Sequence, residues 1–154
     1  MEEYKIPIKV RACDTMGYGV NYPGAVIPRS VQGIIYALHT HAGVPHELLE
    51  WHGHNDFYKA VVNSTTAWLY GCSGVNTSLF GIGERTGNTP LEAMVFEYAQ
   101  LKGGLNGMDT TVITELAEYY EKEIGYHIPS RTPFVGKNFN VTRAGVHADG
   151  LLKN

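Results

Sequence analysis

The sequence predicts an α/β fold in which three strand–helix units follow one another along the chain. Short β-prone or apolar segments alternate with segments whose apolar residues recur at helical spacing. The segments that would follow the strands are rich in Gly, Asn and Asp, which favour loops. The 154 residues, 44% of them hydrophobic, suffice for an ordinary domain with a real core. Successive strand–helix units form either a doubly wound sheet or a TIM barrel, and three units are too few to close a barrel.

The first unit is expected between residues 6 and 41. Residues 6–12 alternate in part and are β-prone, so they predict a strand. Asp14 and Thr15 begin the loop at its carboxyl end. Residues 28–41 predict a helix, because apolar side chains recur there at helical spacing: Val31, Ile34, Ile35 and Leu38.

The second and third units repeat this order. Residues 48–51 form a short apolar strand, and residues 57–70 predict a helix that carries Tyr58, Val61, Val62, Thr65 and Leu69 on one side. Residues 75–80 predict the third strand, and residues 81–87 a glycine-rich loop. Thr89 is expected to cap the last helix, with Pro90 as its first residue. The apolar stripe of that helix is Leu91, Met94, Val95, Tyr98 and Ala99.

The pattern changes after residue 105. Asp109 is expected to cap a further helix that Gly125 ends. The inward side chains of this helix are expected to be Val112, Ile113, Leu116, Ala117 and Tyr120. A linker rich in Pro and Gly follows. We therefore expect residues 1–105 to belong to one domain, and residues 106–154 to lead into a second, smaller one.

Composition excludes several classes of function. The net charge of −3 lacks the basic balance of a nucleic-acid-binding protein. Cys13 and Cys72 are too few for a disulfide framework and are expected to be buried, reduced thiols. Residues 1–5 carry acid where a signal peptide would carry base, and no long apolar run follows. These features predict a cytoplasmic protein that binds no membrane.

The pair His52 and His54 predicts a metal site. On a strand, residues i and i+2 point to the same face, so both imidazoles can reach one ion. The alternative is a pair of hydrogen-bonded histidines near a turn. The second such pair, His39 and His41, lies at a predicted helix end, where the side chains point about 200° apart and cannot chelate together.

Further polar residues follow the predicted strands. Asn55 and Asp56 are either turn and N-cap residues or groups that orient the two histidines. The glycine-rich loop places Glu84, Arg85 and Asn88 within five residues, which favours a site over a plain turn. Polar residues at strand carboxyl ends, such as those of these loops, are the usual site positions of a parallel α/β fold.

Several runs of the sequence resemble a known family. They are Asp14-Thr15-Met16-Gly17-Tyr18, His52-Gly53-His54-Asn55-Asp56, the loop from Gly81 to Asn88, and Ala144-Gly145-Val146-His147-Ala148-Asp149-Gly150. Their order and chemistry are similar to those of the 2-isopropylmalate synthase and homocitrate synthase family, which includes Re-type citrate synthase. The resemblance implies a partial (β/α) TIM barrel of three carboxyl-terminal units, followed by the start of a small subdomain.

The resemblance also implies the chemistry. Its members condense acetyl-CoA with a 2-oxo acid in a Claisen reaction that uses a divalent metal, here Mg²⁺, Mn²⁺ or Zn²⁺. It makes His52 and His54 metal ligands, with Asn88 beside or on the metal. Substrate-binding roles fall on Asp14, Thr15 and Arg85. Catalytic roles fall on His147 and Glu84.

The sequence departs from the family at two points. Tyr58 stands where members carry a small residue, and the run from Phe57 to Asn63 is closer to the Re-type citrate synthases. No D-x-x-R-D-G run, which supplies a metal-binding Asp, is present. We therefore expect the isolated chain to be inactive, and to associate with a complementary amino-terminal half-barrel or with itself.

Two alternatives stay open: a non-catalytic half-barrel remnant or interaction module, and a metal-dependent carbon–carbon lyase. The tail around His147 argues against the lyase. A metal-dependent hydrolase would need further histidines on strands, and neither His127 nor His147 is predicted on one.

Overall fold

A computed structural model describes residues 6–142 of the chain. The chain divides into two compact units, with the boundary between Asn106 and Gly107. No helix within the described residues is both long enough and apolar enough to cross a membrane.

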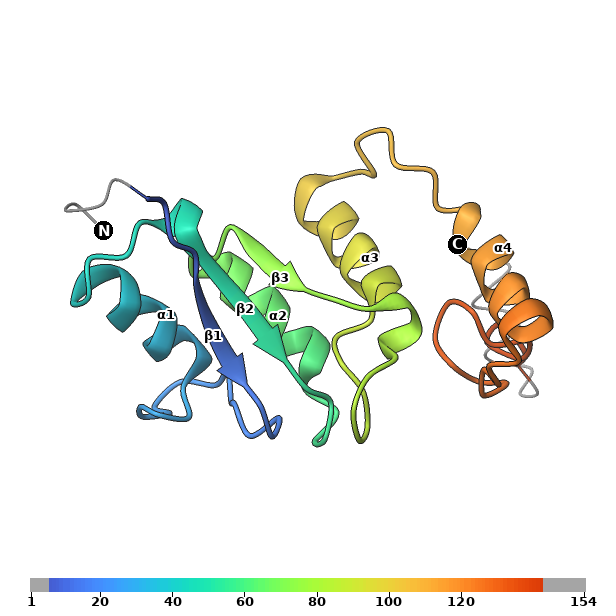
Figure 1. The fold of residues 1–154 in the computed structure, drawn as a ribbon, viewed down its shortest axis with the longest axis horizontal. Coiled ribbons are helices and arrows are strands. Elements are labelled where there is room, and N and C mark those ends of the chain that lie inside the picture. The colour runs from blue at the N-terminus through green and yellow to red at the C-terminus, as the bar shows by residue number, and fades with distance from the viewer. Residues whose placement is uncertain (1–5, 143–154) are drawn as a thin grey trace. The chain divides into compact units, whose positions relative to one another are not determined.

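Unit 1 contains a three-stranded parallel sheet in the order of the sequence (Figure 1). Its strands are β1 (Val10–Asp14), β2 (Leu49–Gly53) and β3 (Gly74–Asn76). The register pairs Cys13 with His52, and His52 with Asn76. The parallel sheet confirms the predicted α/β class and is consistent with part of a barrel. The first strand lies further along the chain than predicted and the third is shorter, because a 3₁₀ turn, η2 (Leu79–Gly81), replaces its second half.

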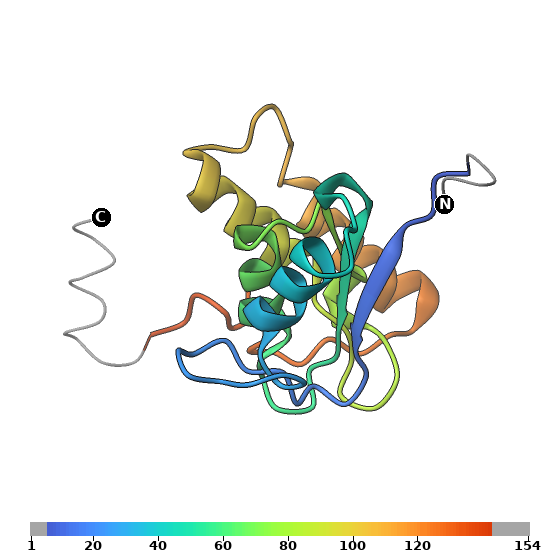
Figure 2. The same ribbon diagram turned by 90° about the vertical axis from the view of Figure 1, so that its left-hand side faces the viewer.

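Three helices alternate with the strands: α1 (Val31–Thr40), α2 (Ala60–Leu69) and α3 (Leu91–Lys102). Helix α1 begins where the hydroxyl of Ser30 accepts the N–H of Gly33, and α3 ends at Gly103 in the left-handed conformation. A short 3₁₀ turn, η1 (His46–Leu48), leads into β2. Figures 1 and 2 show α1 and α2 side by side on the same face of the sheet.

The core lies between this face of the sheet and the two helices. Leu49 and Trp51 of β2 are almost completely buried, against Val31 and Ile35 of α1 and Ala67 of α2. Burying a side chain of this size stabilises the fold by about 1.5–3 kcal/mol. Because strand side chains alternate between faces, this packing places Glu50 and His52 on the opposite face of the sheet.

Three local predictions were wrong. The side of α2 expected from its apolar residues faces solvent: Tyr58 just before the helix is 93% exposed and Leu69 is 64% exposed. The buried side instead consists of small and polar residues: Ala60, Asn63, Ser64, Thr66 and Ala67. Thr89 does not cap α3, since Pro90 is the N-cap and Thr89 is fully buried with its hydroxyl 2.9 Å from that of Ser64. The stripe of α3 also differs, because Leu91 is exposed.

Unit 2 contains α4 (Val112–Tyr119), which continues into a turn of π-helix, η3 (Tyr120–Ile124). Gly125 ends it in the left-handed conformation, as predicted. Asp109 accepts hydrogen bonds from the backbone and hydroxyl of Thr111, directly before the helix. Of the side chains expected inward, Ala117 is buried but Val112 is exposed.

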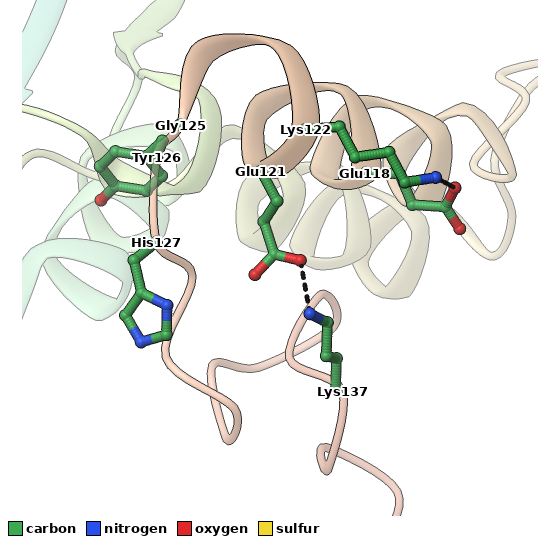
Figure 3. Close-up of a pocket in the computed structure, with 7 residues that line it drawn as sticks. All are labelled: Glu118, Glu121, Lys122, Gly125, Tyr126, His127 and Lys137. Atoms are coloured by element: carbon green, nitrogen blue, oxygen red, sulfur yellow. Dashed lines mark hydrogen bonds and ion pairs between the residues drawn. The ribbon is translucent and has the colours of Figure 1, made fainter.

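A pocket of about 560 Å³ opens between η3 and the segment that follows it (Figure 3). Its charged side chains are paired: Lys137 contacts Glu121 at 2.9 Å, and Lys122 contacts Glu118 at 3.1 Å. The Lys137 contact is the main reason why the pKa of Glu121 is lowered.

Candidate metal centre at the strand ends

The two histidines of the His-x-His run converge. His52 is in β2 and His54 follows its last residue, and their Nε2 atoms are 3.2 Å apart. The ring planes are nearly perpendicular, at 78°. Two nitrogens that each bind one ion at about 2.1 Å, and lie 3.2 Å apart, subtend about 100° at the metal. This angle lies between octahedral and tetrahedral geometry, so both imidazoles can ligate the same ion.

The surroundings favour the neutral imidazole that a metal requires. The pKa of His52 is lowered, first by desolvation and then by the positive charges of His54 and Arg11. His54 is 8% exposed, and its Nδ1 atom is buried without a hydrogen-bond partner in the described residues. The lowered pKa of His52 favours the neutral form of that ring, which can bind an ion without first releasing a proton.

Asn88 is the third candidate ligand. Its backbone forms a bridge with that of His54. The amide oxygen Oδ1 of Asn88 is buried and has no hydrogen-bond partner in residues 6–142. A buried acceptor without a donor is costly unless a cation or another group completes it. Its Nδ2 atom donates to the carbonyl of Ile82 at 3.4 Å, so the amide also holds its own loop. The role of Asn88 as a ligand beside the two imidazoles stays a prediction, and no three His, Cys, Asp or Glu side chains within residues 6–142 come together to hold an ion.

Arg85 ties together the loops that follow all three strands. Its Nε and Nη2 atoms donate to the two carboxylate oxygens of Asp56, at 2.8 and 3.2 Å. Nη2 also donates to the backbone carbonyl of Thr15. The pair lowers the pKa of Asp56 and raises that of Arg85. Arg85 therefore positions the loops around the histidines, and the substrate-binding role that the resemblance implies for it stays a prediction.

Backbone contacts hold the same loops in register. The N–H of His54 donates to the carbonyl of Asp14 at 3.3 Å, and the N–H of Asn55 donates to Gly87 at 3.0 Å. Gly87 has φ +98°, and a Cβ atom there would lie 2.1 Å from the carbonyl oxygen of Gly81. Only glycine fits this position, so the loop that carries Asn88 depends on it.

The remaining site predictions have different outcomes in the geometry. The carboxylate of Asp14 accepts the N–H of Gly19 at 2.9 Å and so shapes its own loop. Thr15 is exposed on that loop. The side chain of Glu84 is 86% exposed, and its nearest cation is Arg85 at 3.9 Å. His147 lies outside the described residues. The roles of these four residues stay predictions.

Asn55 and Asp56 are turn residues here. The side-chain oxygen of Asn55 accepts the N–H of Ala60 at 3.3 Å, near the start of α2. The second His-x-His pair, His39 and His41, separates as expected, because the two rings have different partners. His39 stacks on His46, with ring centroids 3.6 Å apart, whereas His41 lies against Tyr36.

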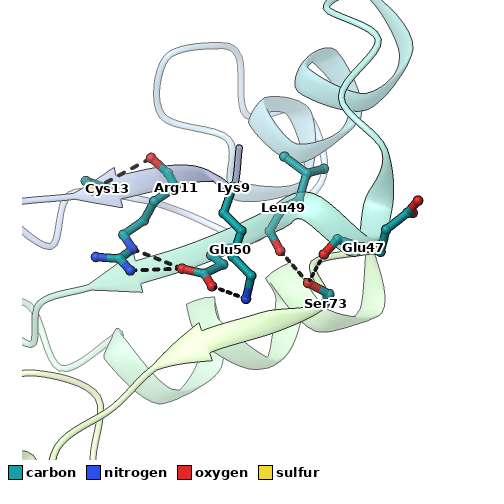
Figure 4. A network of polar contacts seen from close by, with 7 residues as sticks. All are labelled: Lys9, Arg11, Cys13, Glu47, Leu49, Glu50 and Ser73. Atoms are coloured by element: carbon teal, nitrogen blue, oxygen red, sulfur yellow. Dashed lines mark hydrogen bonds and ion pairs between the residues drawn. The ribbon is translucent and has the colours of Figure 1, made fainter. Parts of the chain in front are cut away.

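A charged cluster around Glu50, two residues before His52 on β2, was missed by sequence reasoning (Figure 4). Glu50 accepts hydrogen bonds from Lys9 at 2.7 Å and from Arg11 at 2.9 and 3.1 Å. These contacts lower the pKa of Glu50 to about 2, with Lys9 the largest cause and Arg11 the next. The alternation of strand side chains could have revealed this cluster. Arg11 and Glu50 are register partners on the face of the sheet opposite Ala12 and Trp51.

Comparison with known proteins identifies the family. A family model described as HMGL-like matches residues 7–119. The chain belongs to the HMGL-like family. It is 67% identical over 153 residues to a citrate (Re)-synthase of Clostridium kluyveri, and 62% identical to one of Syntrophus aciditrophicus. It is 33% identical over 146 residues to homocitrate synthase 1 of a Nostoc species. These results confirm the resemblance seen in the sequence.

The HMGL-like relatives are longer than this chain. The two citrate (Re)-synthases are matched over 99% of the chain but only 34% and 24% of their own lengths. An HMG-CoA lyase from Acinetobacter baumannii has a similar structure, with a TM-score of 0.61 and 20% identity over 87% of this chain and 43% of the lyase. At this identity the likeness shows the fold alone, a parallel α/β arrangement that is consistent with part of a barrel.

Proposed function

We propose that this chain is the carboxyl-terminal part of the barrel, with the start of the small subdomain, of an enzyme that condenses acetyl-CoA with a 2-oxo acid. The observation that carries the proposal is the 3.2 Å approach of the His52 and His54 Nε2 atoms at the end of β2. The 67% identity to a citrate (Re)-synthase supports the Re-citrate type among the condensing enzymes of the family.

In this proposal His52, His54 and Asn88 hold a divalent metal ion. The ion supplies Lewis acidity toward the ketone of the 2-oxo acid. The burial of the His54 ring keeps water from the ligands on one side. Arg85 holds the loops of Asp56 and Thr15 in place, so that exposed Thr15 can donate its hydroxyl to the substrate carboxylate.

Proton transfer is assigned to Glu84 and His147 in the same proposal. Removal of a proton from the methyl group of acetyl-CoA requires a positioned base. Glu84 lies on the loop that also carries Arg85 and Asn88, and it is open to an incoming substrate. His147 carries its role by resemblance.

We also propose that the site is completed by a segment outside this chain. The relatives' remaining length provides room for the other strands of a barrel and for further metal ligands. The edges of β1 and β3 each have one strand neighbour within unit 1, and parallel edges of this kind are normally covered. The complementary segment is therefore an amino-terminal half-barrel, with self-association as the alternative.

A chimera tests the function without needing the missing segment in isolation. The matched third of the C. kluyveri enzyme is replaced by this chain, and release of the CoA thiol is measured with acetyl-CoA and a series of 2-oxo acids. We expect activity that needs a divalent metal and is lost in His52→Ala and in His54→Ala. His41→Ala, at the end of α1, is the matched control and should retain activity. A folded chimera that releases no CoA, beside an active parent, would refute the proposal.

A further inference from the structure

Tyr58 occupies an unusual position directly after the candidate metal centre. Its φ is +57°, which places a bulky residue in the left-handed region, and its side chain is 93% exposed. Its N–H donates to the carbonyl of Asn55 at 3.0 Å, so the turn fixes this conformation. Glycine would form the same turn without strain. Within residues 6–142, neither burial nor a tertiary contact of its side chain explains why tyrosine is present.

Two more exposed aromatic residues belong to the two loops after β1 and β2. Tyr18, on the loop after β1, packs on Phe57 with ring centroids 4.9 Å apart, and the two residues are 46% and 49% exposed. Three aromatic residues are thus presented to solvent at the carboxyl ends of β1 and β2. Exposed aromatic rings gathered at one place are typical of a binding surface.

Two cations flank these rings. The guanidinium of Arg29 lies 5.2 Å from the centroid of Tyr18, and the ammonium of Lys59 lies 5.6 Å from that of Phe57. Neither cation has a carboxylate within 4 Å among residues 6–142. Their charges are therefore available to an anion, and they stand next to rings that can stack on a planar base.

We propose that Tyr58, with Tyr18, Phe57, Arg29 and Lys59, binds the nucleotide end of the acyl-CoA substrate, and this rests on the proposed function above. Tyr58 stacks on the adenine, while Arg29 and Lys59 contact the phosphates. A phosphorylated adenosine can stack its base on aromatic rings and pair its phosphates with cations. The left-handed turn then has a physical reason, because in it the ring stands 93% exposed and is open to the base.

Isothermal titration calorimetry measures the affinity of the 154-residue chain for CoA. The comparison ligands are 3′-phospho-ADP, which is the nucleotide end of CoA, and acetate. Tyr58→Gly relieves the backbone strain, so it should fold at least as stably as the parent while binding CoA about tenfold more weakly. Tyr58→Phe keeps the ring and should bind like the parent. Tyr70→Ala, an exposed tyrosine at the other end of α2, is the matched control and should leave binding unchanged.

Further variants distinguish the contacts to the phosphates from the contact to the base. They also distinguish the CoA-binding site from the proposed activity. Arg29→Gln and Lys59→Gln should each weaken CoA binding and reduce its dependence on salt. In the chimera, Tyr58→Gly should raise KM for acetyl-CoA and leave KM for the 2-oxo acid unchanged. Unchanged CoA affinity in Tyr58→Gly overturns the binding site, even in a chimera that condenses acetyl-CoA. CoA binding that needs Tyr58, in a chimera without activity, supports the site and refutes the proposed function instead.

Discussion

The Glu50 cluster makes a quantitative prediction for the Glu50→Gln substitution. The pKa of this carboxyl falls from its ordinary value of 4.5 to about 2 in the folded chain. A shift of this size corresponds to about 3 kcal/mol of preference for the ionised form. The side chains of Lys9 and Arg11 are 62% and 54% exposed, so water screens both contacts. We therefore expect Glu50→Gln to lower the free energy of unfolding at pH 7 by about 1–2 kcal/mol.

The pH dependence has a definite sign. Because the folded-state pKa of Glu50 is the lower one, the ionised carboxylate stabilises the fold above pH 4.5. This contribution is lost as the pH falls from 4.5 toward 2. The difference between the parent chain and Glu50→Gln should thus be constant from pH 6 to pH 8 and should shrink below pH 4.5.

Urea unfolding of the two chains at several pH values measures this difference. Glu118→Gln is the matched control, because its ion pair with Lys122 is more than 60% exposed on both sides and should contribute about 0–0.5 kcal/mol. Equal stability of Glu50→Gln and the parent at pH 7 would refute the argument, as would a difference that persists undiminished at pH 2.5.

Three further substitutions or reactions test the packing of unit 1. Gly87→Ala should lower the free energy of unfolding, measured with urea, by about 2–4 kcal/mol more than Gly103→Ala does. The reason is that a Cβ at Gly87 meets the Gly81 carbonyl, whereas a Cβ at Gly103 meets nothing within 4 Å; similar losses would contradict the loop geometry. Arg85→Ala should reduce activity of the chimera and loosen its loops, seen as faster amide exchange, and a fully active variant would show that the arginine does not position them. Ellman's reagent should titrate one thiol in the folded chain and two after unfolding, since Cys13 is exposed while burial raises the pKa of Cys72 to about 11; two rapid thiols would show that Cys72 is accessible.

Much of the candidate site was predictable because it depends on local rules. The alternation of strand side chains was enough to bring His52 and His54 together, and helix geometry was enough to separate His39 from His41. Parallel strands place their carboxyl ends at one edge, so the loops after β1, β2 and β3 had to meet. These conclusions need only the periodicity of the backbone.

Predictions that depended on which neighbour a side chain meets were less successful. The buried face of α2 is small and polar because Ser64 packs against Thr89 and Asn63 donates to the carbonyl of Gly19 at 3.0 Å. Apolar periodicity alone indicated the opposite face. Cys13 was expected to be buried, but it is exposed, because it follows Ala12 on β1 and so points to the face of the sheet opposite the core.

The sequence by itself determined the order of the strand–helix units, the family and the His-x-His pair, since each is a property of a short run of residues. Only the tertiary structure decided that Arg85 binds Asp56 and Thr15, and that Glu50 binds Lys9 and Arg11. Such partners come from segments about 30 to 70 residues apart in the chain. Their meeting is set by strand register and loop path, and the free energy that selects these is spread over the whole packed unit.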